Sequence, residues 1–185
     1  MAFAAMRKPL LRRILNRAMH SAARTLPGSE SLRPLLHRWR GVSIRGRVFI
    51  GDDVYLENEY PECIEIGEEC EIGLRTVIMA HLRGPGRVVI RKNVWIGPCC
   101  LISSANGRTV TIGEGAVIAG GSVITSDVPE RTFVRPPTSA PAAIANAPLA
   151  ISTYQQFLRG LRPLRMRAKD GVPQSGDASV VGVKE

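Results

Sequence analysis

Aromatic residues, histidines and long apolar runs are all scarce in this chain of 185 residues. Aromatic residues make up 5% of it, and its three histidines and four cysteines lack the paired C-x-x-C spacing that holds zinc. No apolar run is long enough to cross a bilayer, and arginines break the N-terminal stretch where a secretory signal needs its apolar segment. These absences argue against a membrane-spanning protein, a secreted protein and a structural zinc site. Unpaired thiols suit a reducing compartment, so we expect a cytoplasmic protein. An arginine-rich start is also typical of mitochondrial transit peptides, and that alternative stays open.

Positive charge is concentrated towards the two ends of the chain, which has a net charge of +9. Residues 1–40 carry nine Lys or Arg and one acid, Glu30, whereas residues 41–150 carry ten basic and twelve acidic residues. Because the basic segments show no pattern of interleaved aromatic residues and no reader motif, we predict no nucleic-acid partner.

An aliphatic residue recurs at every sixth position between Ile44 and Ile124, in four triplets whose starts are 22, 24 and 22 residues apart. The register consists of Ile44, Ile50, Leu56, Ile66, Ile72, Ile78, Ile90, Ile96, Ile102, Ile112, Ile118 and Ile124. Neither an α-helix nor a plain strand has this period, whereas a triangular β-solenoid uses about six residues for each side and corner. We therefore predict four coils, over residues 44–61, 66–83, 90–107 and 112–129.

Two further features of the hexads describe the corners of the prism. The residue four positions after each aliphatic one is usually small or β-branched, so we expect it to point inward beside the long aliphatic columns. Glycine often follows the aliphatic residue directly, as at 51, 67, 73, 97 and 113, where a corner needs positive φ or close backbone approach. The third hexad of each coil is irregular, and irregularity on one side of a solenoid is where function usually gathers.

We predict four segments. Residues 1–40 form a basic helical N-terminal segment, 41–135 the β-helix, 136–170 an extension with a short helix, and 171–185 a disordered tail. Residues 3–24 read as an amphipathic helix with leucines and isoleucines along one stripe and arginines beside it. It could make a peripheral contact with an anionic membrane at its inner face, or cap the open end of the solenoid, and both can hold together.

The repeats resemble the hexapeptide-repeat acyltransferases, in the branch that acetylates sugars, serine and xenobiotics. The segments that carry the resemblance are IGEECEIGLRTVIMAH (66–81), VVIRKNVWIG (88–97) and VTIGEGAVIAGGSVITSDVP (110–129). The resemblance implies an all-β solenoid, a left-handed parallel β-helix of about four coils with flanking N- and C-terminal helices. It also implies a homotrimer with active sites between adjacent prisms, acetyl-CoA as the acyl donor, no metal, and a hydroxyl of a sugar or glycan as the acceptor, as in polysaccharide biosynthesis.

The histidine of that family matches His81 by context, after the IG of the second coil and before VWIG. A neutral imidazole suits removal of the acceptor's proton near pH 7, so His81 is the candidate general base. The matching donor-binding positions are Trp95, Gly97, Gly120, Gly121, Ser122, Thr125, Arg131 and Arg135. For the acceptor we consider Glu57, Asn58 and Arg83; Glu57 to Glu59 could orient the imidazole or bind hydroxyls, but a solvated corner is the simpler role for at least two of them.

Three departures from the family pattern concern the donor site and its surroundings. Ser126 stands where related enzymes often have lysine, and residues 135–139 read RPPTS. The step from Ile102 to Ile112 is four residues longer than a plain hexad, so loop 103–111 could shape the site. The acceptor's identity, the acyl chain length and the choice between CoA and acyl carrier protein stay open. A catalytically silent scaffold is the main alternative function, whereas a γ-carbonic-anhydrase-type zinc site would need three histidine ligands and the repeat contains one.

Overall fold

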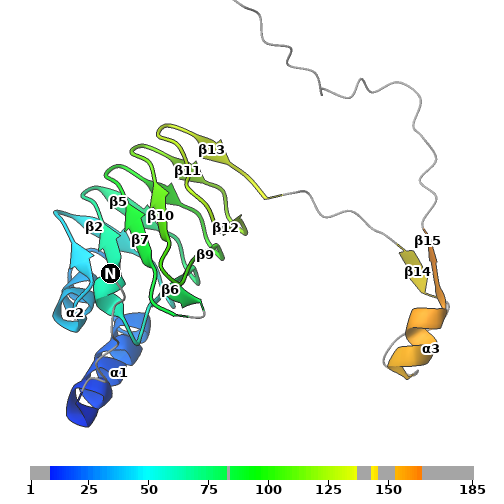
Figure 1. The fold of residues 1–185 in the computed structure, drawn as a ribbon, viewed down its shortest axis with the longest axis horizontal. Helices are drawn as coiled ribbons and strands as arrows, with labels where there is room; N and C mark the ends of the chain where they lie inside the picture. The colour runs from blue at the N-terminus through cyan, green and yellow to red at the C-terminus, as the bar shows by residue number, and fades with distance from the viewer. Residues whose placement is uncertain (1–8, 83, 137–142, 146–152, 164–185) are drawn as a thin grey trace, which may run out of the picture. The chain divides into compact units, whose positions relative to one another are not determined.

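In a computed structural model, which describes residues 9–82, 84–136, 143–145 and 153–163, the repeat winds into a left-handed parallel β-helix (Figure 1). Its three sides are three sheets of parallel strands stacked coil upon coil. The first sheet has the order β1 (Ser43–Ile44), β4 (Ile64–Ile66), β7 (Arg87–Ile90) and β10 (Thr109–Ile112). The second has the order β13 (Phe133–Val134), β11 (Val117–Ile118), β8 (Trp95–Ile96), β5 (Cys70–Ile72) and β2 (Val48–Ile50). The third has the order β12 (Val123–Ile124), β9 (Leu101–Ala105), β6 (Val77–Leu82) and β3 (Tyr55–Leu56).

The core is made of the aliphatic columns that the sequence predicts. Register residues of successive coils pair directly, as Ile50 does with Ile72 and Ile72 with Ile96. All twelve are buried, and full burial of each such side chain stabilises the fold by about 1.5–3 kcal/mol. The small positions are buried as well, including Cys70 and Cys100, so these two thiols fill the core as expected.

The corner glycines serve close packing of the coils and not positive φ. None of the glycines at 51, 67, 73, 97 and 113 has a positive φ, so that part of the expectation is wrong. A Cβ on Gly97 would lie 2.5 Å from the backbone nitrogen of Gly120 in the next coil. The left-handed conformation falls two residues later and is taken mostly by residues with side chains, such as Asp53, Glu69 and Asn93.

The solenoid continues past the fourth predicted coil. β13 pairs in parallel with β11, and Ile112 bridges to Val128, so a partial fifth coil covers the C-terminal end. The predicted loop 103–111 is largely strand: β9 and β10 are joined by a turn, in which Gly107 N donates to Pro85 O at 2.9 Å.

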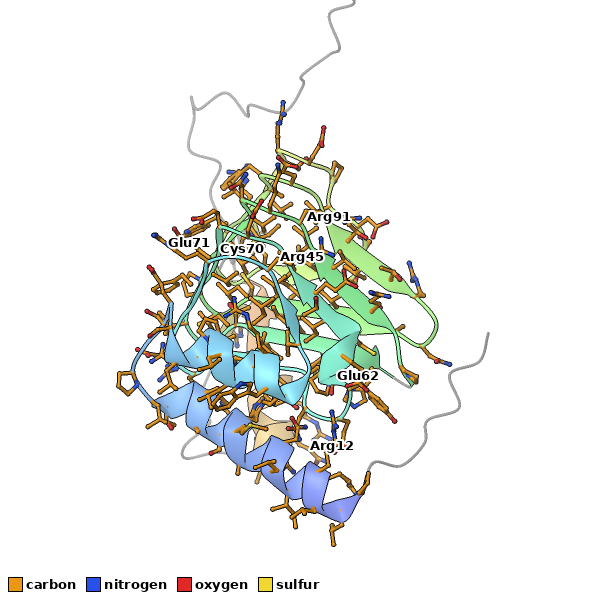
Figure 2. All side chains as sticks on the ribbon, turned by 90° about the vertical axis from the view of Figure 1, so that its left-hand side faces the viewer. Arg12, Arg45, Glu62, Cys70, Glu71 and Arg91 are labelled. Atoms are coloured by element: carbon orange, nitrogen blue, oxygen red, sulfur yellow. The ribbon has the colours of Figure 1, made fainter. Side chains whose placement is uncertain are left out.

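Two helices cover the N-terminal end of the prism, α1 (Leu10–Thr25) and α2 (Leu32–Arg40), with a short 3-10 turn, η1 (Pro61–Cys63), further along the chain. α2 lies between α1 and the first coil (Figure 2), and Gly41 ends it with φ at 110°. The last turn of α1 and the link after it take up the free strand edge, because Asp53 N donates to Arg24 O and Ile50 N to Ser29 O. The predicted capping role is therefore confirmed.

The predicted apolar stripe of α1 is not the face that packs. Leu10 and Leu11 are 70% and 77% exposed, and the buried residues of the helix are His20 and Ala23. Residues 3–8 of the predicted helix lie outside the described residues. Among the helices that the structure describes, none is long and apolar enough to cross a membrane.

Residues 138–185 form a separate unit, in which the structure describes β14 (Ala143–Ala145), α3 (Tyr154–Arg159) and β15 (Leu161–Pro163). β14 and β15 pair antiparallel, and α3 is the predicted short C-terminal helix. The predicted disordered tail, 171–185, lies outside the described residues.

Candidate active site

A β-bulge aims His81 out of the regular coil. In the ladder between β6 and β9, Met79 pairs with Ser103 and Leu82 with Ala105, so Ala80 and His81 together oppose Ser104. Bulges bend a strand and redirect a side chain, and they are frequent beside active sites. The irregular third hexad of the sequence corresponds to this bulge.

Glu57 sits directly behind the imidazole, on the preceding coil. Its side chain is completely buried, and its Oε2 atom accepts hydrogen bonds from His81 Nδ1 and, at 3.1 Å, from Ala80 N. Its Oε1 atom accepts from Glu59 N at 2.8 Å. Burial acts to raise the pKa of Glu57, but the hydrogen bonds from His81, Ala80 and Glu59 outweigh it and lower the pKa below its ordinary value. The expectation of a solvated corner is wrong for Glu57 and also for Asn58, which is buried.

The contact with Glu57 assigns the proton on the imidazole. An ionised carboxylate only accepts, so Nδ1–H of His81 donates, and in the neutral form of the ring the lone pair is then on Nε2. The His81 side chain is 36% exposed, and the Tyr60 ring lies edge-on to it with centroids 5.7 Å apart. This arrangement presents an oriented imidazole that is accessible from outside.

Arg40 of α2 holds the backbone beneath this pair, which sequence reasoning did not detect. Its guanidinium is buried and donates to Glu57 O at 2.6 Å, to Leu56 O at 3.2 Å and to Asn16 Oδ1 at 2.9 Å. A fourth contact, of 2.8 Å, joins it to His37 Nδ1. An arginine in the last turn of a basic helix is usually solvated, so no local signal marks it as buried.

Two buried histidines lie around Arg40. Burial, with a smaller effect of Arg40, lowers the pKa of His37 to about 3. Burial and the charges of Arg40, Arg24 and Arg17 lower the pKa of His20 to about 4. Both rings are therefore neutral near pH 7, and among the described residues neither nitrogen of His20 has a hydrogen-bond partner.

The chain is similar in sequence and in structure to known acetyltransferases. The curated protein "Putative acetyltransferase YvoF" of Bacillus subtilis is 36% identical over 80 residues, which are 40% of this chain and 44% of that protein. The chain thus spans less than half the length of this relative. Vibrio cholerae provides a solved structure, the hexapeptide-repeat-containing acetyltransferase VCA0836 complexed with acetyl coenzyme A. It matches with a TM-score of 0.50 and 22% identity, over 68% of this chain and 82% of that chain.

The chain has the hexapeptide-repeat acetyltransferase fold. A galactoside acetyltransferase in complex with coenzyme A also matches, at a TM-score of 0.44 and 16% identity, over 74% of this chain and 80% of that chain. No family model matches the sequence. The resemblance read from the hexads is thus confirmed for the fold.

The residues expected to bind the donor are spread over the prism of this hexapeptide-repeat fold. Trp95 is 42% exposed on β8, a different sheet from the β6 of His81, and lines a shallow groove with Phe49 and Leu74. Gly97 is buried against the next coil. Ser122 is buried in the core, and its Oγ donates to Ala119 O at 2.6 Å, so its side chain does not face the surface where the donor is expected to lie.

The remaining expected residues divide by exposure. Gly120 is partly buried, whereas Gly121, Thr125, Arg131 and Arg135 are exposed at the corners and edges of the later coils. Arg83 lies outside the described residues. Within one chain, the structure brings Glu57, Asn58 and His81 together and leaves the expected donor residues on other parts of the prism.

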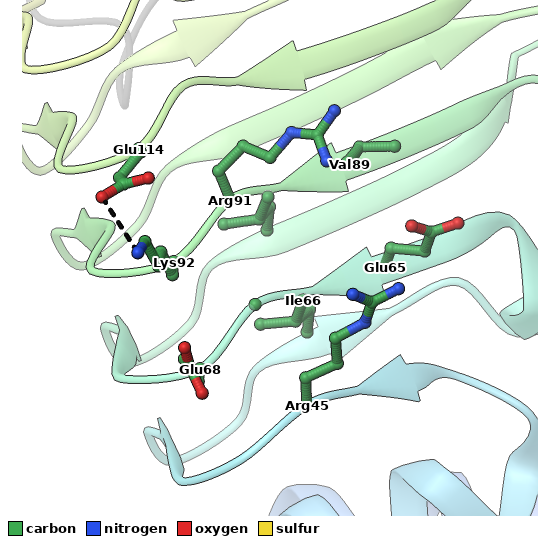
Figure 3. A pocket seen from close by; sticks show the side chains of 10 residues that line it. Arg45, Glu65, Ile66, Glu68, Val89, Arg91, Lys92 and Glu114 are labelled. Atoms are coloured by element: carbon green, nitrogen blue, oxygen red, sulfur yellow. Dashed lines mark ion pairs between the residues drawn. The ribbon is translucent and has the colours of Figure 1, made fainter.

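A second groove, of about 350 Å³, runs along the sheet of β1, β4, β7 and β10 (Figure 3). Arg45, Arg91 and Lys92 line it together with glutamates, and Lys92 Nζ lies 3.4 Å from Glu114 Oε1. No histidine, cysteine or hydroxyl side chain lines this groove, and its titratable groups are the glutamates, Arg45, Arg91 and Lys92. Elsewhere too, the described residues hold no group of three or more His, Cys, Asp or Glu that could hold a metal ion.

Proposed function

We propose that the protein is an acetyl-CoA-dependent O-acetyltransferase that acetylates a hydroxyl of a sugar or glycan, with His81 as the general base. The observation that carries the proposal is the Glu57–His81 pair, held in a bulge of a hexapeptide-repeat acetyltransferase fold. A buried carboxylate behind a partly exposed imidazole is an arrangement suited to taking a proton from an alcohol.

The reaction proposed is a single acyl transfer. The acceptor oxygen attacks the thioester carbonyl carbon while His81 Nε2 takes the hydroxyl proton. Glu57 stabilises the imidazolium that results. Collapse of the tetrahedral intermediate breaks the carbon–sulfur bond, and the imidazolium returns its proton to the departing thiolate of CoA, so the base is regenerated.

For the donor we propose the exposed positions on the later coils, namely Trp95, Gly120, Gly121, Thr125, Arg131 and Arg135. The arginines would meet CoA phosphates, and Arg83 would meet an anionic acceptor. We also propose a homotrimer. Trp95 and His81 lie on different sides of one prism, so a second copy would have to supply the donor half of each site. Gly97 contributes only by allowing the coils to pack closely.

We also keep the proposal that α1 makes a peripheral contact with an anionic membrane. Its support is the exposure of Leu10 and Leu11 beside arginines.

Release of free thiol from acetyl-CoA with a panel of sugars tests the proposed activity. We expect His81→Ala to lower kcat by at least about 100-fold, because general-base help is worth about 10² to 10⁴ in rate. Acetyl-CoA should still raise the Tm of that variant. Lys92→Ala, on another side of the prism, should retain wild-type turnover. Turnover in His81→Ala near that of the wild type would contradict the assignment, and the absence of any Tm shift in the wild type would favour a silent scaffold.

Glu57→Gln tests the partner of the base. We expect kcat to fall at least tenfold, because the amide can donate to Nδ1 and stabilise the tautomer that lacks a lone pair on Nε2. The KM for acetyl-CoA should change little. Glu68→Gln, on a different corner, is the matched control, and an equal effect of the two substitutions would show that Glu57 has no special role.

A further inference from the structure

A groove of about 480 Å³ opens between α1 and the turn that follows Glu57. Asn58 and Glu59 form its wall on the solenoid side. The same turn holds the base, because Glu59 N donates to the carboxylate of Glu57 that binds His81. The groove therefore borders the turn that follows Glu57, the partner of the proposed base.

The α1 side of the groove combines apolar and cationic side chains. Leu10 and Ile14 line it, and Leu11 and Leu15 are exposed on the same two turns of the helix. Arg13 and Arg17 line it as well. Among the described residues no carboxylate lies within ion-pair distance of Arg17, and the nearest carboxylate oxygen of Glu59 is 4.0 Å from Arg13 Nε.

A polar group on the solenoid side also lacks a partner. The side-chain oxygen of Asn58 is buried and accepts no hydrogen bond from the described residues. The backbone beneath it is fixed, because Asn58 O accepts from Asn16 Nδ2 and Arg40 donates to Glu57 O. A carboxamide on a rigid turn, with an unused acceptor, suits a ligand that carries hydroxyl groups.

These three features together favour an amphiphile over a free sugar. A neutral sugar would leave the exposed leucines uncovered and would not compensate the charge of Arg17. An anionic lipid has an acyl region for the apolar turns, a phosphate for the arginines and a hydroxylated headgroup that can reach the turn of Asn58. Arg12, on the same helix, is exposed and would add positive charge at the surface of a bilayer.

We propose that the acceptor is a hydroxyl on the headgroup of an anionic membrane lipid, which the groove between α1 and Asn58–Glu59 holds beside His81. This inference rests on the proposed acetyl transfer and names its substrate class. α1 then has two roles: its second half caps the solenoid through His20 and Ala23, and its first half lies in the membrane surface and admits the acceptor.

Vesicle co-sedimentation of the full chain is the first test. We expect binding to vesicles of phosphatidylcholine and phosphatidylglycerol at 3:1, and at least tenfold weaker binding to phosphatidylcholine alone. The double variant Leu11→Glu, Ile14→Glu should lose at least tenfold in binding. Leu26→Glu is the matched control, an exposed leucine after the same helix that does not line the groove, and it should bind as the wild type does. Unchanged binding of the double variant, or no binding of the wild type, overturns the proposal.

Acetyl transfer to lipid is the second test. Thiol release is measured with phosphatidylinositol, phosphatidylglycerol and cardiolipin in phosphatidylcholine vesicles, and with free inositol, glycerol and sugars in solution. We expect release with at least one vesicle-borne lipid, and an increase in its KM of at least tenfold in Arg17→Gln with kcat retained. Release with soluble acceptors alone overturns this inference and leaves the proposed function intact. Release with neither, together with no Tm shift by acetyl-CoA, overturns both.

Discussion

At the scale of single residues, the site contains buried polar groups, of which some have all their hydrogen-bond partners and others have none. Glu57 is ionised and fully satisfied, whereas His20 is buried without a hydrogen-bond partner among the described residues. A buried ring that stays neutral has little effect on the pH dependence of stability near pH 7. In acid the unfolded chain binds protons that the buried rings cannot bind, so the free energy of unfolding falls. The buried histidines and the buried Glu57 therefore make the free energy of unfolding depend on pH in different ranges.

The free energy of unfolding should fall as the pH is lowered from 6.5 to 4.5. The folded-state pKa values of His20 and His37, about 4 and about 3, lie below their ordinary value of 6.5, so in this window the unfolded chain binds more protons. Because a tenfold difference in proton affinity is worth about 1.4 kcal/mol, the loss should amount to roughly 2 kcal/mol or more. The lowered pKa of Glu57 adds a further loss as the pH falls through its ordinary value of 4.5, because there the unfolded chain takes up a proton that the folded carboxylate does not.

Urea unfolding at a series of pH values measures this slope. His20→Phe, which keeps a ring beside Tyr55, should reduce the slope between pH 6.5 and 4.5. Lys92→Ala should leave it unchanged. An identical slope in His20→Phe and the wild type would contradict the argument.

Arg40→Met should lower the free energy of unfolding by roughly 3 kcal/mol, because Glu57 O and Asn16 lose their donor inside the protein. It should also lower kcat by disturbing the turn of Glu57, with little change in the KM for acetyl-CoA. Arg38→Met, which removes an arginine from the same helix that donates to Ile44 O and Gly46 O, is the control for general destabilisation. If both variants lose stability but neither loses kcat, Arg40 has only a structural role.

At the scale of elements, the coil depends on corners where one backbone passes directly over another. At Gly97 and Gly113 a Cβ would come within 2.5 Å of backbone atoms of the next coil, and backbone cannot move aside as a flexible side chain can. The turn residues with positive φ follow these glycines and tolerate side chains that point to solvent. In each such hexad, close approach of two backbones occurs at the glycine, and positive φ occurs two residues later.

Gly97→Ala and Gly107→Ala separate these requirements. Gly107 has φ of +69° and nothing within 4 Å of an added Cβ, so alanine there should cost only about 1 kcal/mol of backbone strain. Gly97→Ala should cost at least about 2 kcal/mol, because two coils must move apart. Thermal or urea unfolding gives both values, and an equal cost at the two positions would show that coil contact is not the reason for glycine at Gly97.

At the scale of the whole molecule, the prism has apolar side chains on its outer sides. Trp95, Val123 and Phe133 are large, exposed and carried by β8, β12 and β13. Exposed apolar surface of this kind on a folded prism is often an interface between subunits.

We expect the protein in solution to have three times the 20.1 kDa mass of one chain. Sedimentation equilibrium measures this mass, and Val123→Glu should shift it towards the monomer if β12 lies at the interface. Arg87→Glu on the first sheet serves as a control for an added negative charge. A monomer with full activity would rule out a site shared between copies.

The sequence by itself determined the fold and marked His81 as the candidate for the proposed base. A period of six is a local constraint that every coil repeats, so the aliphatic columns, the small corner positions and the place of His81 could be read without coordinates. Tertiary structure alone decided that Glu57 is buried behind His81, that Arg40 lies beneath it, that Ser122 fills the core, and that the leucines of α1 face outward. The physical reason is that burial of a polar group depends on partners from other coils and helices, as Glu57 depends on Ala80 and Arg40, and no pattern within one hexad or one helix records which partners will arrive.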